Sequence, residues 1–470
     1  MLDQSFSYEN LKEIYDIEKR KGNSLDEMFL SAGRIAGINS QIKDIYKEIK
    51  KRKLEFSKKV TEKRKATLNQ EIDEFEDKLT KAKESKKLIL KKEFETISDE
   101  INSNAFSVTI EKVENFLDSK KALYLIQDDI KGFLFKKHIQ IQLNKLYKIK
   151  QSNRYLIVSQ IYEILNRQTT LFNVIKIDIK NFYESINLSG LEKKLVLDDN
   201  LLSPKIKKHV ASILDQYKNL SGSSNGIPRG IGLSAYLGEL YMREFDRGMQ
   251  RNDQIFFYAR YVDDIIVITA KDSLFEINTV TRELNSMSLE LNTQKTFNLR
   301  DVACTKDAFD YLGYSFTFCN KNTPNENLIV DISEKRFERY KEKIDLAFSA
   351  YQKTSTYGRK ASKYLFVRIK FLVSNVRLTG EKKNIVSGIY YSNKLINTPS
   401  KKLGLMDAYL ATKINKIKSV SLKKELEKLT FTEGFSSEDR KFFFLRKNRV
   451  GDNKESKEIR QILKIWDYVK

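Results

Sequence analysis

The sequence contains few of the residues that form cross-links or zinc centres. Among 470 residues there are two cysteines, Cys304 and Cys319, and two histidines, His138 and His209. Two thiols cannot build a disulfide framework or a four-thiolate zinc site. Neither histidine follows an arginine at the spacing of four to six residues that is typical of one class of appended ribonuclease. We therefore expect neither a zinc-dependent nor a histidine-based nuclease.

Long apolar runs are also missing. No stretch approaches the roughly 18 residues that a membrane-spanning helix needs. The first ten residues are polar and acidic, whereas a secretory signal is basic and then apolar. These features predict a cytoplasmic protein without a membrane partner.

Proline is scarce, with four in the chain and none before Pro204, so long helices are allowed in the N-terminal region. After an N-terminal segment of residues 1–37, apolar residues recur at steps of three and four, which places them on helical stripes. The pattern predicts a helical hairpin or coiled-coil arm at residues 38–103. A structural or oligomerisation role is favoured for this arm, and a nucleic-acid clamp is the alternative. The stripe residues are Ile38, Ile42, Ile45, Ile49, Leu68, Ile72, Phe75, Leu79, Leu90, Phe94, Ile97 and Ile101.

Positive charge is in large excess, with 86 lysines and arginines against 63 acidic residues and a formal net charge of +23. An excess of this size attracts polyanions, through phosphate contacts and counterion release. The alternative is an ordinary solvated surface in a lysine-rich chain. Charge alone therefore indicates a nucleic-acid partner without establishing one.

Short β-branched and aromatic runs alternate with helical stretches in the middle of the chain, which predicts an α+β core within residues 104–320. From about residue 328 a helical period returns, with basic amphipathic stretches at 335–351 and 361–377. We therefore predict a helical C-terminal region over residues 321–470. The expected strands cover 173–179, 256–261, 265–269 and 311–318.

Two of these expected strands end on carboxylates. One apolar strand runs into Asp263 and Asp264 and a second runs out, which predicts a β-hairpin with both residues at its tip. Another strand ends on Asp178, just before a helix. Adjacent carboxylates repel each other unless a cation neutralises them. If the strands share a sheet, the three residues form an oxygen-rich site suited to Mg²⁺ rather than zinc. The plainer alternatives are an ordinary turn and a helix N-cap.

The sequence resembles the reverse transcriptases at these residues and at three further motifs. Tyr-Val-Asp-Asp at 261–264 is similar to the catalytic turn of that family, and residues 178–186 are similar to its first catalytic motif. The other similar segments, in the family's order, are Asn225-Gly-Ile-Pro-Arg-Gly230 with Leu233-Ser-Ala235, Leu291-Asn-Thr-Gln-Lys-Thr296, and Tyr311-Leu-Gly-Tyr314, which resembles the primer-grip turn.

The resemblance implies a right-hand polymerase palm with fingers and a C-terminal thumb-like region. It implies an RNA-directed DNA polymerase that binds two Mg²⁺ ions, with Mn²⁺ as the alternative, through Asp178, Asp263 and Asp264 and the Ile179 carbonyl. Tyr183 would exclude the 2′-hydroxyl of a ribonucleotide, which disfavours an RNA polymerase.

Lys295 would lie near the triphosphate, and Arg229 and Gly230 near the nucleotide and template. The fingers would offer three weaker candidate cations to the triphosphate, namely Lys148, Lys150 and Arg154.

One residue departs from the family pattern. Arg229 stands where many reverse transcriptases have glutamine, and this puts ordinary template copying in doubt. Template-independent or protein-primed DNA synthesis therefore stays open. A non-catalytic nucleic-acid-binding scaffold is the third alternative, and the presence of all three aspartates argues against it.

The C-terminal region resembles bacterial defence-associated and abortive-infection reverse transcriptases, including their type 3 systems, at residues 368–378 and 388–394. This resemblance implies a role in defence against phage. The expected partners are dNTPs, an RNA template such as a noncoding RNA, the DNA product, and a second copy of the chain or a second reverse transcriptase subunit.

Overall fold

The computed structural model describes residues 3–466 apart from 22–24, 58–60, 114–121, 127–128, 150, 168–171, 196–200, 301–307, 319–327, 355–358, 380–384, 398, 437–441 and 447–453. Helices and strands are mixed, so the predicted α+β class is confirmed. No helix in this part of the chain is both long and apolar enough to span a bilayer. Cys304, Cys319 and Lys150 lie outside the described residues.

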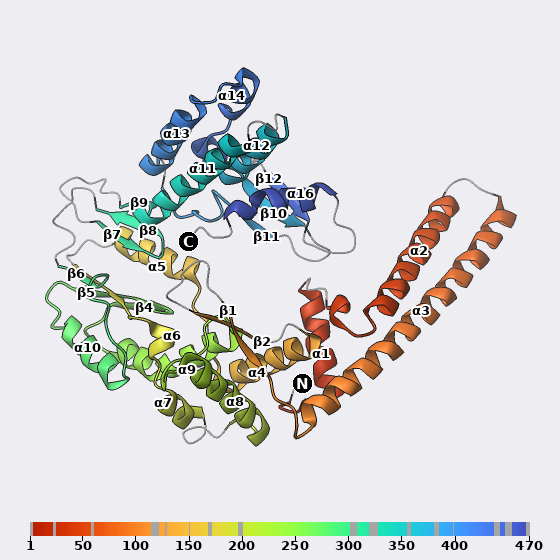
Figure 1. Cartoon of the computed structure of the whole chain (residues 1–470), viewed down its shortest axis with the longest axis horizontal. Coiled ribbons are helices and arrows are strands. Elements are labelled where there is room, and N and C mark those ends of the chain that lie inside the picture. Colours follow the sequence, from red (N-terminus) through yellow and green to blue (C-terminus); the bar gives the residue numbers. More distant parts are fainter. Residues whose placement is uncertain are drawn as a thin grey trace.

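The N-terminal region is helical and carries a projecting arm (Figure 1). Two long helices pack against each other along the arm, and a shorter helix packs at its base. Stripe residues contribute to this contact, because Leu68, Ile72 and Leu79 are buried on the second long helix, whose other face is charged. The helices are α1 (Tyr8–Arg20), α2 (Ala32–Phe56) and α3 (Glu62–Asn102), with a 3-10 turn at Asp26–Met28.

Both histidines are core residues. His138 and His209 are buried against the ring of Phe6, which also stacks on Phe135. Burial lowers the pKa of each imidazole to about 4, so both are neutral at pH 7. They anchor the N-terminal segment to helices α4 (Ile130–Tyr147) and α8 (Pro204–Ser221).

A four-stranded antiparallel sheet forms the centre of the molecule, with the strand order β4-β5-β3-β6. Successive side chains of each strand point to opposite faces of the sheet, and both faces are buried. Ile175, Ile177 and Val267 join one core together with α9 (Gly232–Arg251). Val174 and Ile266 join a second core together with α5 (Arg154–Arg167). The strands are β3 (Phe172–Asp178), β4 (Phe257–Tyr261), β5 (Asp264–Ala270) and β6 (Phe297–Leu299).

Short elements surround this sheet. The hairpin of β1 (Ile110–Val113) and β2 (Leu123–Ile126) precedes it. Helix α8 shows how the local sequence sets the boundaries, because Ser203 caps its start, Pro204 opens it and Gly222 ends it at φ +69°. The remaining helices are α6 (Phe182–Ser185), α7 (Leu188–Lys193) and α10 (Ile277–Ser286).

A second antiparallel sheet connects the centre to the C-terminal region, which lies above the central sheet in Figure 1. Its strands are β7 (Ala308–Tyr311), β8 (Tyr314–Thr317) and β9 (Ile329–Ile332). Beyond it lie α11 (Glu334–Thr354), α12 (Arg359–Val373), α13 (Lys401–Ile414), α14 (Val420–Leu426), α15 (Phe431–Ser436), α16 (Lys454–Leu463) and a 3-10 turn at Lys464–Trp466.

The C-terminal region is less uniformly helical than the sequence predicted. The helix expected over 361–377 ends at Val373, and a strand begins at Asn375. Asn375 is fully buried; its side chain donates to the Gly434 carbonyl and accepts from the Tyr390 amide. These contacts between distant segments override the helical period. A third sheet results, from β10 (Asn375–Thr379), β11 (Ile385–Gly388) and β12 (Phe442–Arg446).

Candidate active site

Pairing of the central strands brings the three candidate aspartates together. In the antiparallel pair β3–β5, Asp178 lies directly opposite Asp264. Directly opposed residues have Cα atoms only about 4.5–5.5 Å apart. Asp263 occupies the two-residue turn that joins β4 to β5, beside Val262, whose φ is +59°. A β-branched residue rarely adopts this conformation, so the turn is held by its surroundings.

Backbone hydrogen bonds fix the segments that carry these carboxylates. The Ile179 amide donates to the Asp263 carbonyl at 3.0 Å, and the Asn292 amide donates to the Asp178 carbonyl at 2.8 Å. On the far side, the Tyr311 hydroxyl donates to the Asp264 carbonyl at 3.1 Å. The turn at Asp263, the end of β3 and the turn predicted to be the primer grip are therefore one connected unit.

The carboxylates repel each other in a partly buried setting. Burial raises the pKa of Asp264 to about 6, and the negative charges of Asp263 and Asp178 add to the effect. Burial also raises the pKa of Asp263, and Asp178 contributes there as well. Lys295 opposes the shift at both residues. A cation placed among these oxygens would remove the repulsion.

Asp178 already has polar partners. Its Oδ1 accepts from the Asn292 side chain at 2.8 Å, and the Lys295 ammonium lies 3.5 Å from both carboxylate oxygens. The structure thus brings Lys295 to the carboxylates. The role of Asn292 was missed, although it lies in the motif at residues 291–296, because amide pairing cannot be read from a strand pattern.

Tyr183 lies beside the same site on the short helix α6. Its ring is half-buried against Phe182 at 5.4 Å, and the Arg229 guanidinium lies 5.0 Å from its centroid on another side. Burial raises the pKa of Tyr183, and the Asp263 charge contributes to that rise. The ring is therefore held in place near the turn at Asp263.

Arg229 is held by a carboxylate that the sequence did not reveal. Its fork makes two hydrogen bonds to Glu184, at 2.9 and 3.0 Å, which together form a bidentate ion pair. The Arg229 carbonyl also accepts from the Tyr124 amide at 2.7 Å. Arg229 thus connects three elements: α6, the 225–230 loop and the β1–β2 hairpin.

Gly230 is required by the close approach of this hairpin. Its φ is +98°, and an added Cβ would lie 2.8 Å from the Tyr124 carbonyl oxygen. Any side chain would both strain the backbone and push the hairpin away.

Arg154 and Lys148, which were expected to offer cations to the triphosphate, contact other parts of the structure. Arg154 donates to the Leu312 carbonyl at 2.8 Å, at the turn between β7 and β8. Arg336 of α11 approaches the same turn, because a Cβ on Gly313 would meet both guanidinium groups. Lys148 ends α4 in the left-handed conformation and lines a cavity beside β4.

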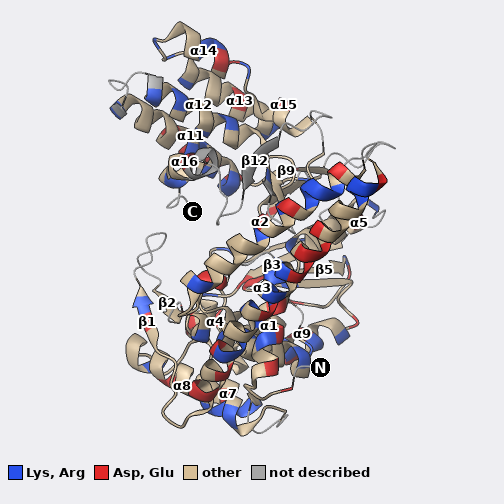
Figure 2. Cartoon of the chain, turned by 90° about the vertical axis from the view of Figure 1, so that its right-hand side faces the viewer, with Lys and Arg blue, Asp and Glu red and all other residues tan. Residues whose placement is uncertain are grey.

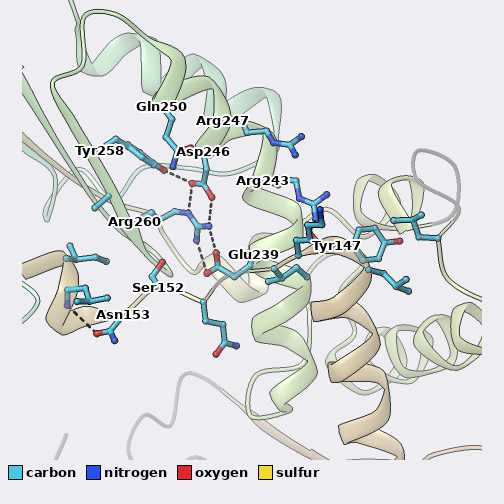
Figure 3. A pocket seen from close by; sticks show the side chains of 18 residues that line it. Tyr147, Ser152, Asn153, Glu239, Arg243, Asp246, Arg247, Gln250, Tyr258 and Arg260 are labelled. Atoms are coloured by element: carbon cyan, nitrogen blue, oxygen red, sulfur yellow. Dashed lines mark hydrogen bonds and ion pairs between the residues drawn. The ribbon is translucent and has the colours of Figure 1, made fainter. Parts of the chain in front are cut away.

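That cavity of about 720 Å³ contains a buried ion network that the sequence also missed (Figure 3). The Arg260 side chain is 2% exposed and binds both Glu239 and Asp246 of α9. Its Nη1 donates to the Val262 carbonyl at 3.0 Å, so Arg260 also holds the turn at Val262 and Asp263. The only feature of the sequence that could have indicated this network is an arginine at the fourth position of an apolar strand.

Comparison with known proteins identifies one domain in the chain. The model of the reverse transcriptase (RNA-dependent DNA polymerase) family matches residues 134–316, which include all three aspartates. The chain therefore contains a reverse transcriptase domain with the expected palm fold, and it is an RNA-directed DNA polymerase, a nucleotidyltransferase. No curated protein matches the chain.

Several solved telomerases are among the structures to which the chain is similar. A truncated apo telomerase from Candida tropicalis is 15% identical over 71% of this chain and 83% of that chain, with a TM-score of 0.34. A Candida albicans telomerase in complex with a fragment of telomeric RNA is 12% identical over 70% of this chain and 67% of its own, with a TM-score of 0.36. Apo telomerase from Candida tropicalis is 14% identical over 90% of this chain and 81% of its own, also at 0.36.

Proposed function

We propose that this enzyme synthesises DNA from dNTPs on an RNA template, using divalent metal ions bound by Asp178, Asp263 and Asp264. The observation that carries the proposal is the cross-strand pairing of Asp178 with Asp264 beside the Asp263 turn. Three carboxylates at the end of one sheet, of which Asp263 and Asp264 have raised pKa values, are suited to bind Mg²⁺, or Mn²⁺ as the alternative.

The donor chemistry fits such ions, although the carboxylates are not yet arranged around one. Among the described residues, no group of three or more acidic, histidine or cysteine side chains is positioned to hold a metal. Asp178 is instead engaged by Asn292 and Lys295. Ion binding would therefore turn the Asp178 carboxylate and free the Lys295 ammonium. When bound, a pair of divalent ions activates the 3′-hydroxyl and stabilises the leaving pyrophosphate.

The chain's own residues supply positioning and selectivity. The freed Lys295 would hold the triphosphate, and the Ile179 carbonyl would complete the ion site. Tyr183, fixed between Phe182 and Arg229, would block the space below the sugar and exclude ribonucleotides. Arg229 and Gly230 would contact the incoming nucleotide and the templating base.

The biological role that we propose is bacterial, cytoplasmic defence against phage. It is supported by the resemblance at residues 368–378 and 388–394. The partners would be a noncoding RNA template and a second reverse transcriptase subunit or a second copy of this chain. Because a cation replaces the usual glutamine at Arg229, template-independent or protein-primed synthesis is the second candidate.

Two measurements test this proposal. Purified protein is given dNTPs with an RNA template, a DNA template or none, with Mg²⁺ or EDTA, and the nucleic acid that copurifies is sequenced. We expect Mg²⁺-dependent incorporation and a copurifying RNA whose complement appears in the product. Incorporation in EDTA would contradict the metal assignment, and a product without any matching RNA would favour the second candidate. Plaque counts with and without the Asp263→Asn substitution test the defence role.

A further inference from the structure

A lysine-lined groove lies at the base of the arm, between α1 and α3. It encloses about 310 Å³. Six lysines and one carboxylate, Asp16, line it. Three of the lysines are in ion pairs, Lys12 with Asp16, and Lys19 and Lys86 with Asp26. Two tyrosine rings, Tyr8 and Tyr15, form part of its wall. The lysines are Lys12, Lys19, Lys83, Lys86, Lys87 and Lys91.

Three of these lysines form a row along one helix. Lys83, Lys87 and Lys91 follow each other at four-residue steps on α3, so they lie on one face about 6 Å apart along the helix axis. Like charges at this spacing repel and destabilise the helix. Among the described residues, neither Lys83 nor Lys87 has an acidic partner, and Lys91 has only a distant contact of 3.6 Å to Glu95. The row therefore favours an anionic ligand.

The distal half of the same arm is different. There several basic side chains pair with acidic neighbours on the same or the facing helix, and Figure 2 shows both signs of charge along the arm. Arg52 pairs with Glu48 and Glu71, and Lys53 pairs with Glu76. The segregation of lysines at the base is thus a local feature and not a property of the whole arm.

The groove is separated from the catalytic carboxylates by two helices. Helices α1 and α3 pack on α4, α4 packs on α9, and α9 packs on the central sheet. A ligand in the groove would therefore lie outside the part of a template that is being copied. Lysine ammonium groups bind phosphate as point charges without reading bases, which suits a nucleic-acid backbone.

We propose that this groove binds the phosphodiester backbone of RNA outside the copied region. The inference rests on the proposed use of an RNA template. The row of three lysines covers about 12 Å of helix, a length over which a strand presents several phosphates, since one strand carries a charge about every 3.4 Å. Binding would be independent of base sequence and sensitive to salt.

The test compares RNA binding by two triple variants with equal loss of charge. One carries Lys83→Gln, Lys87→Gln and Lys91→Gln in the groove. The control carries Lys50→Gln, Lys51→Gln and Lys63→Gln, three exposed lysines near the tip of the arm. Fluorescence anisotropy with a labelled single-stranded RNA gives Kd over a series of salt concentrations, and a DNA of the same sequence is measured in parallel. Thermal unfolding confirms that each variant is folded.

We expect the groove variant to reduce the slope of log K against log salt by about 2, because each lost phosphate contact removes about 0.7 from the slope for a single strand. The control slope should stay unchanged, and a variant with arginine at the three groove positions should bind like the original protein. Equal effects of the two triples would overturn the proposal in favour of diffuse attraction. Weaker binding of DNA alone would overturn RNA as the ligand.

Polymerisation separates this inference from the proposed function. On a primed template too short to reach the groove, the groove variant should incorporate dNTPs at the original rate. Failure of the unsubstituted protein to incorporate dNTPs would refute the proposed function. Unchanged RNA binding by the groove variant, with normal incorporation, would refute only the groove.

Discussion

Replacing Asp264 with asparagine should stabilise the metal-free protein while removing activity. The pKa of Asp264 is raised from 3.8 to about 6, first by burial and then by the charges of Asp263 and Asp178. A folded pKa above the unfolded one means that folding disfavours the ionised carboxylate. The native state therefore loses stability as the pH rises from about 4 to about 6, and it does not regain that stability at higher pH.

The magnitude follows from the shift. One pKa unit corresponds to about 1.4 kcal/mol, so the full shift would cost close to 3 kcal/mol. Water still reaches the Asp264 side chain, and we expect about 1–2 kcal/mol in practice. For a domain of this size, such a gain raises the melting temperature by about 2–4 °C per kcal/mol.

Thermal unfolding in EDTA at pH 8 and at pH 5 measures this effect. The Asp264→Asn protein should melt above the original protein at pH 8, and the difference should shrink at pH 5, where Asp264 is largely protonated. Adding Mg²⁺ should stabilise the original protein more than the variant. A matched control is Asp272→Asn, an exposed carboxylate just beyond the end of the same strand. Equal or lower stability of Asp264→Asn at pH 8 would refute the repulsion among the carboxylates.

Four further substitutions test the site. Asp263→Asn should abolish Mg²⁺-dependent incorporation without lowering the melting temperature, and an active folded variant would exclude Asp263 as a metal ligand. Tyr183→Ala should admit ribonucleotides, because an enlarged pocket rejects an added hydroxyl poorly; an unchanged ratio of dNTP to NTP use would assign the ring to the core. Arg229→Gln should still polymerise but with altered nucleotide preference or product sequence, whereas an unchanged product with lower yield and shallower salt dependence would reduce Arg229 to a phosphate contact. Arg260→Ala should cost about 3 kcal/mol of stability, since it leaves the partly buried Glu239 and Asp246 without their cation, and chemical denaturation would show this.

The sequence predicted those parts of the site that depend on local pattern. The apolar runs in the sequence predicted a strand that ends on Asp178 and a hairpin with Asp263 at its turn. The cross-strand register of Asp178 with Asp264 follows once both strands enter one sheet. The arm was predictable for the same reason, because its stripe persists over many helical turns.

The partners of the site residues were not predictable in this way. Glu184 on Arg229, Asn292 on Asp178 and the acidic pair on Arg260 join segments that are far apart along the chain. Nothing in the local pattern specifies such pairs, since each is created by the way helices pack on the sheet. The strand at Asn375 was missed for a related reason, as buried contacts to distant backbone groups outweigh helical periodicity.

The turn at Leu312 and Gly313 has a mechanical consequence. Arg154 approaches it from the helix that covers the central sheet, and Arg336 approaches it from the first helix of the C-terminal region. The two positive charges repel each other. Burial lowers the pKa of Arg154, and the nearby Arg336 charge lowers it further. Two guanidinium groups of like charge thus pack against the same glycine. A side chain at position 313 would therefore displace both guanidinium groups at once, and it would disturb the palm and the C-terminal region together.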